Sequence, residues 1–260
     1  MIVLQGIIYD EKSSFLRGPA KAPPVIRAAY HSSSANYFAE NGLEVDPSVF
    51  VDKGDFKPAD YFDIERITAS NLDGEQQIIS LGGDHSVTYP IVKALHSVHG
   101  PLQILHIDAH GDLYDSFDGD PYSHACPFAR IMEDKLASRL VQLGIRTLNT
   151  HQREQAAKYG VEITEMKDLD LHRLPRFTSP IYLSVDIDAL DPAYAPGVSH
   201  QEPGGLSTRS LIQIIQAVKV PILGADIVEY NPDRDVDKRT AMVCAKIFRE
   251  ICSAMITNKT

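Results

Sequence analysis

The chain has 260 residues, 43% of them hydrophobic, which is enough to bury the core of one large α/β domain. This composition excludes a disordered chain, and no apolar run approaches the roughly 20 residues that a membrane helix needs. The formal net charge of −10 argues against nucleic acid as the main partner and fits a cationic or neutral small ligand.

Short apolar runs alternate with segments of helical period, which is typical of a parallel sheet covered by helices on both faces. We expect strands at residues 1–9, 76–83, 102–110, 139–146, 180–188 and 220–228. We expect helices at residues 90–99, 123–138, 153–159, 208–218 and 240–256, and the proline-led segment 23–30 could open another. No long linker or repeat divides the chain, so we expect a single domain over residues 1–260.

The cysteines and the first residues bear on location. Cys126, Cys244 and Cys252 show neither CxxC spacing nor a disulfide framework, which is typical of thiols in a reducing compartment. The opening segment "MIVLQGIIYD" lacks the basic and long apolar regions of a secretory signal. We therefore expect a cytoplasmic protein.

Acidic and histidine side chains follow four of the predicted strands at the point where each strand ends. These residues, in chain order, are Asp84, His85, Asp108, His110, Asp112, Asp186, Asp188, Asp226 and Glu229. Ligands bind at the carboxyl ends of strands in an open parallel sheet, and side chains two apart on an extended chain point to the same side. Burying so many carboxylates without a counter-charge would cost more than the net stability of a domain. A cation must lie among them.

The types of side chain indicate the metal. Zinc sites prefer cysteine or mostly histidine, whereas two histidines with several carboxylates suit two Mn²⁺ ions or a similar hard divalent metal. We assign Asp108 and Asp186 as shared ligands, His85 and Asp112 to one ion, and His110 and Asp188 to the other. Two such ions roughly 3.5 Å apart can hold a bridging water with a pKa near neutrality. The alternative interpretation is that these residues are solvated or cap the following helices.

The motifs "GGDHS", "DAHGD", "SVDIDALDP" and "DIVEYNP" together resemble those of the ureohydrolase family, which includes arginase and agmatinase. "SSFLRGPAKAPPVIRAA", "YSHACPFARIMED" and "APGVSHQEPGGLSTRSLI" extend the resemblance over nearly the whole chain and are most similar to plant arginases. The resemblance implies a three-layer α/β/α domain with a mainly parallel sheet, a binuclear Mn²⁺ site and assembly into trimers or hexamers.

Two departures from the family stand out. Gly111 occupies a position where relatives commonly carry a bulkier residue; glycine permits unusual backbone angles, and this change removes no metal ligand. The chain also begins later than the plant arginases, from which we expect that an organellar targeting segment is missing.

The expected reaction assigns roles to further residues. A guanidinium is a poor electrophile, so its attack needs a hydroxide that bridges two metals. Glu229 is the expected partner of the guanidinium, because a carboxylate accepts parallel N–H bonds from it. Asp112 is expected to move the proton of the hydroxide to the leaving amine. The resemblance implies that His124 shuttles protons.

Other residues are expected to support the site. Tyr114 and Asp118 lie in the loop after the metal motif and are expected to contact the tail of the substrate. Asp226 is expected to support a metal ligand from behind, and His106 is interpreted as a packed core residue in preference to such a supporting role. His200 is a candidate for the rim of the pocket.

Arginine and agmatine differ only by the α-carboxylate. The loop over residues 113–123 holds three acids and no Arg or Lys, which favours agmatine, whereas the resemblance to plant arginases favours arginine. We predict an arginase that yields urea and ornithine, with an agmatinase or another guanidino-acid ureohydrolase as the alternative. A deacetylase would use one zinc and fewer acids, and a non-catalytic metal-binding relative would lack a ligand or Glu229.

Overall fold

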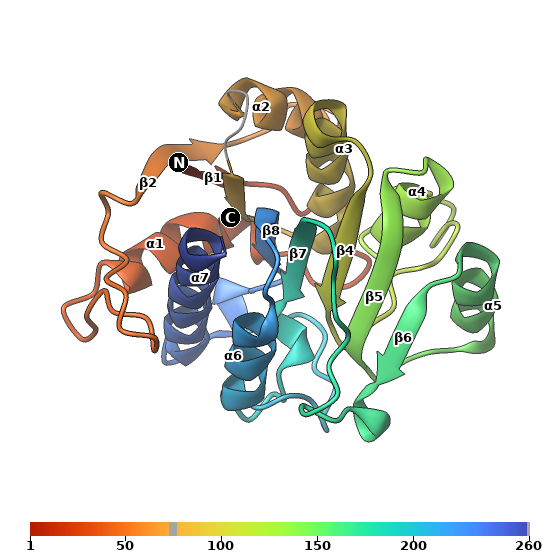
Figure 1. Cartoon of the computed structure of the whole chain (residues 1–260). Coiled ribbons are helices and arrows are strands. Elements are labelled where there is room, and N and C mark those ends of the chain that lie inside the picture. The colour runs from red at the N-terminus through yellow and green to blue at the C-terminus, as the bar shows by residue number, and fades with distance from the viewer. Residues whose placement is uncertain (73–76, 259–260) are drawn as a thin grey trace.

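The computed structural model of the chain describes residues 1–72 and 77–258 and contains one sheet of eight parallel strands (Figure 1). The order across the sheet is β2-β1-β3-β8-β7-β4-β5-β6. The strands are β1 (Ile2–Ile7), β2 (Phe50–Phe56), β3 (Gln77–Leu81), β4 (Leu102–Ile107), β5 (Ala137–Ile145), β6 (Glu162–Glu165), β7 (Ile181–Asp186) and β8 (Ile222–Val228). Because all the strands run the same way, their carboxyl ends lie along one edge of the sheet.

Helices cover both faces of this sheet (Figure 1). One face carries α1 (Ala22–Tyr30), α6 (Thr208–Ala217) and α7 (Arg239–Thr257). The other face carries α2 (Asp63–Asn71), α3 (Thr88–His99), α4 (Pro127–Glu133) and α5 (Thr150–Tyr159). None of the helices in the described ranges is long and apolar enough to cross a membrane. The expected three-layer α/β/α architecture is confirmed.

Alternating apolar residues of the inner strands supply the two cores. In β1, Ile2 and Leu4 pack with α1 and α7, while Val3 packs with the opposite helices. In β4, Leu105 and Ile104 divide between the two faces in the same way. Both faces of the inner strands are therefore buried, which explains why they read as continuous apolar runs.

The six predicted strands and the predicted helices correspond to elements of the structure, with differences at some boundaries; residue 76 of the second predicted strand lies outside the described residues. Two strands, β2 and β6, were not predicted because their sequences "FVDKGDF" and "EITE" lack an apolar run, as suits the exposed edges of a sheet. The polar helix α2 was not predicted for a similar reason.

The predicted helix at residues 123–138 is much too long. Helix α4 spans only Pro127–Glu133, and Lys135 then takes a left-handed conformation with φ of 57°. Residues 137 and 138 already belong to β5. The apolar side chains after Glu133 therefore serve a strand, and the left-handed residue ends the helical period that the sequence had suggested.

Candidate metal centre and adjoining pocket

Six predicted metal-binding side chains come together at the carboxyl edge of the sheet, at the ends of β3, β4 and β7. They are His85, Asp108, His110, Asp112, Asp186 and Asp188. His85 is the first residue of the short 3-10 helix η2 (His85–Val87), which follows the end of β3 after three residues. Asp188 lies in the 3-10 helix η4 (Ile187–Ala189), directly after β7. The strand ends fix the positions of both short helices, so residues far apart in sequence meet at one place.

The two histidines each face several carboxylates. Nδ1 of His85 lies 3.1 Å from an oxygen of each of Asp108, Asp112 and Asp186. Nδ1 of His110 lies 3.1 Å from Oδ2 of Asp188 and 3.4 Å from Oδ1 of Asp108. The cluster of Asp108, His110 and Asp188 places its donor atoms within 4.8 Å of one another, as a shared cation requires. The structure thus brings all six predicted side chains into two adjoining groups.

The electrostatics of this cluster are those of a site that lacks a counter-charge. Burial, followed by repulsion from Asp188 and Asp108, raises the pKa of Asp186 well above its usual value. Burial opposes a charge on His85, but the three carboxylates outweigh it and raise the pKa of that ring well above its usual value. Protons therefore bind where divalent cations would neutralise the same carboxylates.

The environment of His85 fits a metal ligand. Its Nδ1 is buried and makes no hydrogen bond of acceptable geometry, although three carboxylates surround it. Its Nε2 lies 2.9 Å from Oγ of Ser184, and that hydroxyl donates to Oδ1 of Asp226 at 2.7 Å. The chain from Asp226 through Ser184 leaves Nδ1 of His85 pointing at the carboxylates, which is the orientation that a ligating imidazole needs.

A second acidic group, Glu229, adjoins the cluster and contacts the predicted shuttle residue. Oε1 of Glu229 accepts hydrogen bonds from the backbone N–H of His85 at 2.9 Å and from Nδ1 of His124 at 2.8 Å. Glu229 and Asp112 both adopt left-handed conformations, with φ of 63° and 48°. Such backbone strain in residues other than glycine is common at functional sites.

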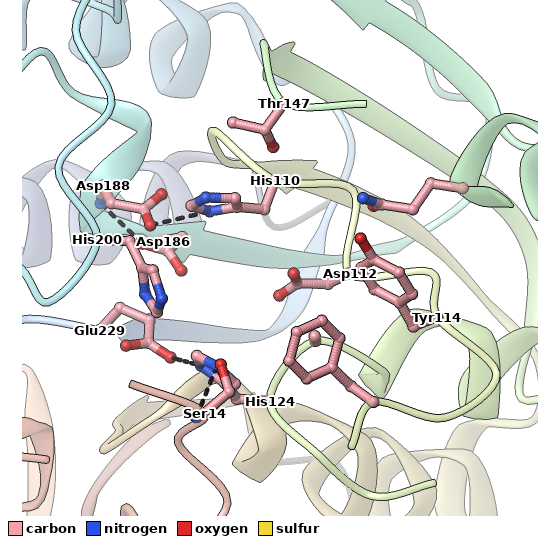
Figure 2. A pocket seen from close by; sticks show the side chains of 13 residues that line it. Ser14, His110, Asp112, Tyr114, His124, Thr147, Asp186, Asp188, His200 and Glu229 are labelled. Carbon is pink, nitrogen blue, oxygen red and sulfur yellow. Dashed lines mark hydrogen bonds and ion pairs between the residues drawn. The ribbon is translucent and has the colours of Figure 1, made fainter. Parts of the chain in front are cut away.

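His124 continues this contact toward the surface. Burial disfavours its charge, but Glu229 raises the pKa of the ring from 6.5 to about 9. Nε2 of His124 lies 2.7 Å from Oγ of Ser14, which is exposed, and 3.1 Å from the backbone nitrogen of the same residue. In the charged ring Nε2 is a donor, so the hydroxyl and not the backbone N–H is then its partner. Glu229, His124 and Ser14 form a continuous path from the buried acid to solvent (Figure 2).

A cavity of about 230 Å³ opens over these groups. Its lining includes the predicted residues His110, Asp112, Tyr114, His124, Asp186, Asp188, His200 and Glu229 (Figure 2). Ser14, Phe117, Ala125, Thr147 and Gln152 complete it and were not predicted as site residues, although the motifs "SSFLRGPAKAPPVIRAA" and "YSHACPFARIMED" contain Ser14 and Ala125. No Lys or Arg is among these lining residues.

The two predicted contacts to the substrate tail have different surroundings. Tyr114 lines the cavity, and its hydroxyl accepts a hydrogen bond from Nδ2 of Asn149 at 2.6 Å, which leaves the phenolic proton free to donate. Asp118 is exposed, sits in a turn with φ of 50° and does not line the cavity. Of these two residues, only Tyr114 is therefore retained as a candidate contact to the substrate tail.

The surroundings of Gly111 are close-packed, while its backbone angle is ordinary. Its φ lies outside the positive range that glycine alone adopts readily. A Cβ at this position would lie 2.6 Å from Oε1 of Gln152 and 3.1 Å from a methyl of Leu148. The folded chain does not use the unusual backbone angles that glycine permits at Gly111, and the missing side chain leaves room for Gln152 in the cavity wall.

Comparisons with known proteins agree with this geometry. The family model described as "Arginase family" matches residues 1–253. A curated relative, "Arginase 1, mitochondrial" of Arabidopsis thaliana, is 44% identical over 96% of this chain and 80% of its own length. The solved arginase from Medicago truncatula has a TM-score of 0.90 and 41% identity, covering 98% of this chain and 87% of that one. An agmatinase of Bacillus cereus is 34% identical over 72% of this chain and 67% of its own length.

The names of these relatives contradict the prediction of a cytoplasmic protein. The Arabidopsis relative is named as mitochondrial, and a second Arabidopsis arginase, 43% identical over 97% of this chain and 80% of its own length, is named as chloroplastic or mitochondrial. Both names place those relatives in organelles. The prediction had rested on the absence of a secretory signal, and that absence does not separate the cytoplasm from the interior of an organelle.

Proposed function

The chain belongs to the arginase family, and we propose that it hydrolyses the guanidino group of L-arginine to give urea and ornithine. The observation that carries this proposal is the position of Glu229 beside the cluster of six metal-binding side chains, in the same cavity. One carboxylate is thus available for a guanidinium next to a site for divalent cations. The names of the plant relatives support arginine, in preference to other guanidino compounds, as the substrate.

The cations in this proposal are two Mn²⁺ ions per chain. Asp108 and Asp186 would be shared, with His85 and Asp112 on one ion and His110 and Asp188 on the other. The free Nδ1 of His85 and the facing carboxylates are the donors that a hard divalent cation with some affinity for imidazole prefers. When bound, the ions would supply a hydroxide nucleophile at neutral pH.

Glu229 binds and orients the guanidinium in this proposal. Its Oε1 already accepts two hydrogen bonds, from His85 and His124, which hold the carboxylate still. These bonds lower the pKa of Glu229 against the opposing effect of burial, so that it stays charged at neutral pH. Its Oε2 then takes an N–H of the planar cation and holds the guanidinium carbon toward the metal centre.

Asp112 and His124 handle the protons. Asp112 lines the cavity at the metal centre and takes the proton of the nucleophile, which it passes to the departing amine. His124 returns a proton from the surface, because Nε2 contacts the exposed hydroxyl of Ser14 while Nδ1 contacts Glu229. The ornithine amine therefore leaves as a protonated group, and urea remains to dissociate.

The opposite end of the cavity decides between arginine and agmatine. The lining there offers the hydroxyls of Tyr114 and Thr147 and the amide of Gln152, all of them neutral. The phenolic O–H of Tyr114 and the amide N–H groups of Gln152 can donate to the α-carboxylate of arginine, whereas Thr147 already donates its hydroxyl proton to the carbonyl oxygen of Ala109. No cation among the lining residues strengthens that contact. This absence favours agmatine, or another guanidino compound, as the second candidate substrate.

Two organisational features belong to the same proposal. The chain acts as one ureohydrolase domain over residues 1–260, which agrees with a single sheet that unites the described strands. It assembles into a homotrimer or a hexamer, as the family resemblance implies. Size-exclusion chromatography with light scattering separates these two states from a monomer.

Urea release measures the proposed activity directly. Purified protein loaded with Mn²⁺ is expected to show a higher kcat/KM with L-arginine than with agmatine. A higher value with agmatine would make the second candidate correct. Absence of urea from a panel of guanidino compounds, in protein that demonstrably binds two Mn²⁺, would favour the non-catalytic metal-binding relative.

A further inference from the structure

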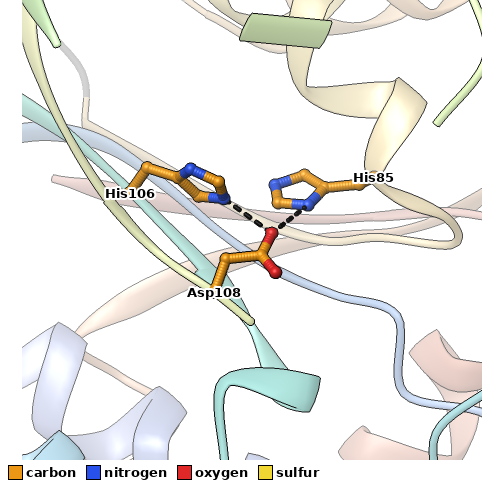
Figure 3. Close-up of side chains that lie close together, drawn as sticks. All are labelled: His85, His106 and Asp108. Atoms are coloured by element: carbon orange, nitrogen blue, oxygen red, sulfur yellow. Dashed lines mark hydrogen bonds and ion pairs between the residues drawn. The ribbon is translucent and has the colours of Figure 1, made fainter. Parts of the chain in front are cut away.

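A buried polar pair lies directly beneath the metal centre. His106 of β4 and Gln142 of β5 are paired residues in the sheet, and the side chains of both are fully buried. His106 had been interpreted as a packed core residue. Figure 3 shows its ring aimed at Asp108, opposite His85. Nε2 of His106 lies 2.7 Å from Oδ2 of that carboxylate.

The hydrogen bonds of Gln142 determine which nitrogen of His106 carries the proton. Nε2 of Gln142 lies 2.6 Å from the carbonyl oxygen of Gly111, which can only accept, so the amide nitrogen must face it. The same Nε2 lies 3.0 Å from Nδ1 of His106 and donates to it. Nδ1 therefore carries no proton, and the N–H of His106 is at Nε2, where it donates to Asp108.

Further contacts hold both ends of this chain. The ring of His106 stacks on Phe128 of α4, with centroids 3.9 Å apart and planes 27° apart. The other oxygen of Asp108, Oδ1, accepts the backbone N–H of His110 at 2.6 Å. Each oxygen of Asp108 thus has one fixed donor within the protein, which sets the plane of the carboxylate before any cation binds.

We propose that His106 and Gln142 are positioning residues that hold Asp108, and the backbone at Gly111, in the arrangement that receives divalent cations. This inference rests on the proposed function, because Asp108 is taken as a shared ligand. The hydrogen bond from Gln142 to the carbonyl oxygen of Gly111 also restrains the neighbouring Asp112, whose left-handed backbone is strained and must be stabilised by contacts around it. Hydrogen bonds of this kind to metal ligands are worth about 10- to 100-fold in metal affinity.

Gln142→Leu and His106→Phe test the proposal by isothermal titration of the metal-free protein with Mn²⁺. Leucine removes both amide donors, and phenylalanine keeps a ring against Phe128 without the N–H. We expect each variant to raise the Kd of Mn²⁺ about 10- to 100-fold. The double variant should lose little more Mn²⁺ affinity than either single variant, because the two substitutions break the same chain of hydrogen bonds.

Gln103→Leu is the matched control. Gln103 lies on β4 away from the proposed metal centre, and its Oε1, like that of Gln142, is buried without a hydrogen-bond partner. Its Mn²⁺ affinity should equal that of the unchanged protein. If Gln142→Leu does not fold, His106→Phe decides alone. Affinities within twofold of the unchanged protein would overturn the positioning role and leave the proposed function intact. Absence of Mn²⁺ binding by the unchanged protein would contradict the metal centre itself.

Discussion

Glu229 combines three features at the scale of a single residue: a left-handed backbone, a buried charge and two hydrogen bonds to Oε1. Its carboxylate also faces the cavity beside the metal centre (Figure 2). A residue held in this way is already oriented before a substrate arrives. The backbone N–H of Glu229 donates to the carbonyl of Gly83 at 2.9 Å, which anchors the strained conformation.

Glu229→Gln is expected to lower kcat/KM for L-arginine roughly 10- to 100-fold, because a hydrogen bond between two charged groups becomes one to a neutral amide. Steady-state urea release at a fixed Mn²⁺ concentration measures the change. Glu202→Gln, at an exposed position outside the cavity, is the matched control. Equal kcat/KM for the two variants would exclude Glu229 as the partner of the guanidinium.

The pair of His124 and Glu229 predicts a pH dependence of stability in the metal-free protein. The pKa of His124 rises from 6.5 to about 9 in the folded protein, so the stabilisation is complete below pH 6.5 and is lost as pH rises through about 9. The lowered pKa of Glu229 means that the pair also weakens as the solution becomes acidic enough to protonate that carboxylate.

Urea unfolding of the unchanged protein and of His124→Asn, in the presence of a chelator, measures this window. The difference in the free energy of unfolding should be larger at pH 6.5 than above pH 9, where it should shrink toward zero. The exposed His31→Asn should show no such trend. A difference that grows with pH would contradict the charged pair.

Part of the site could be predicted residue by residue, and part could not. The six proposed metal ligands follow apolar strands at spacings of one or two residues, so local periodicity suffices to place them together. Ser14 and Gln152 carry no such signal, because they reach the cavity from a loop and from the first turn of α5. The role of Gln142 could not be predicted, because it lies inside the apolar run of β5 and nothing in the sequence distinguishes it from the other strand residues.

At the scale of elements, the ends of β1, β3 and β8 meet at Gly83. A Cβ at this position would lie 1.5 Å from the carbonyl oxygen of Tyr9, so only glycine fits. The same residue accepts the N–H of Glu229, which follows β8. The contact between these strand ends therefore depends on one missing side chain.

Gly83→Ala is expected to destabilise the protein by about 1–3 kcal/mol or more, because backbone must move to relieve the overlap. Chemical denaturation gives the free energy of unfolding. Gly119→Ala is the control for backbone conformation, since Gly119 has φ of 82° and open space around it. This substitution, which meets no steric overlap, should lower the free energy of unfolding by about 1–2 kcal/mol. If Gly83→Ala were the milder of the two, the close approach of the strand ends would be in error.

Element boundaries show where sequence patterns are informative. Inner strands such as β4 and β7 are buried on both faces and stand out as apolar runs. The edge strands β2 and β6 have one neighbour each and polar sequences, so no pattern marks them. Their pairing depends on backbone contacts to β1 and β5, which a single sequence does not reveal.

At the scale of the whole molecule, the proposed metal centre trades the stability of the metal-free protein for function. Asp186 and its neighbours repel one another in the metal-free protein, and burial removes the water that would screen them. Bound cations relieve the repulsion. Each bound ion at about 100 times its Kd would add about 2.7 kcal/mol to the free energy of unfolding.

Asp186→Asn should therefore reverse the order of stability. Without metal, the variant is expected to melt at a higher temperature than the unchanged protein, because the raised pKa of Asp186 makes folding at neutral pH require the uptake of a proton, and the neutral amide needs none. With Mn²⁺, the unchanged protein should rise in Tm and the variant should rise much less. Thermal unfolding with chelator and with Mn²⁺ measures both, and an equal metal-induced shift in the two proteins would exclude Asp186 as a ligand.

The most direct test of the account is an anomalous difference map from crystals soaked in Mn²⁺, recorded near the manganese absorption edge. We predict two peaks at the carboxyl edge of the sheet, enclosed by His85, Asp108, His110, Asp112, Asp186 and Asp188, with Asp108 and Asp186 in contact with both. A map without peaks among these side chains, or with their carboxylates spread apart in solvent, would contradict the proposed binuclear centre.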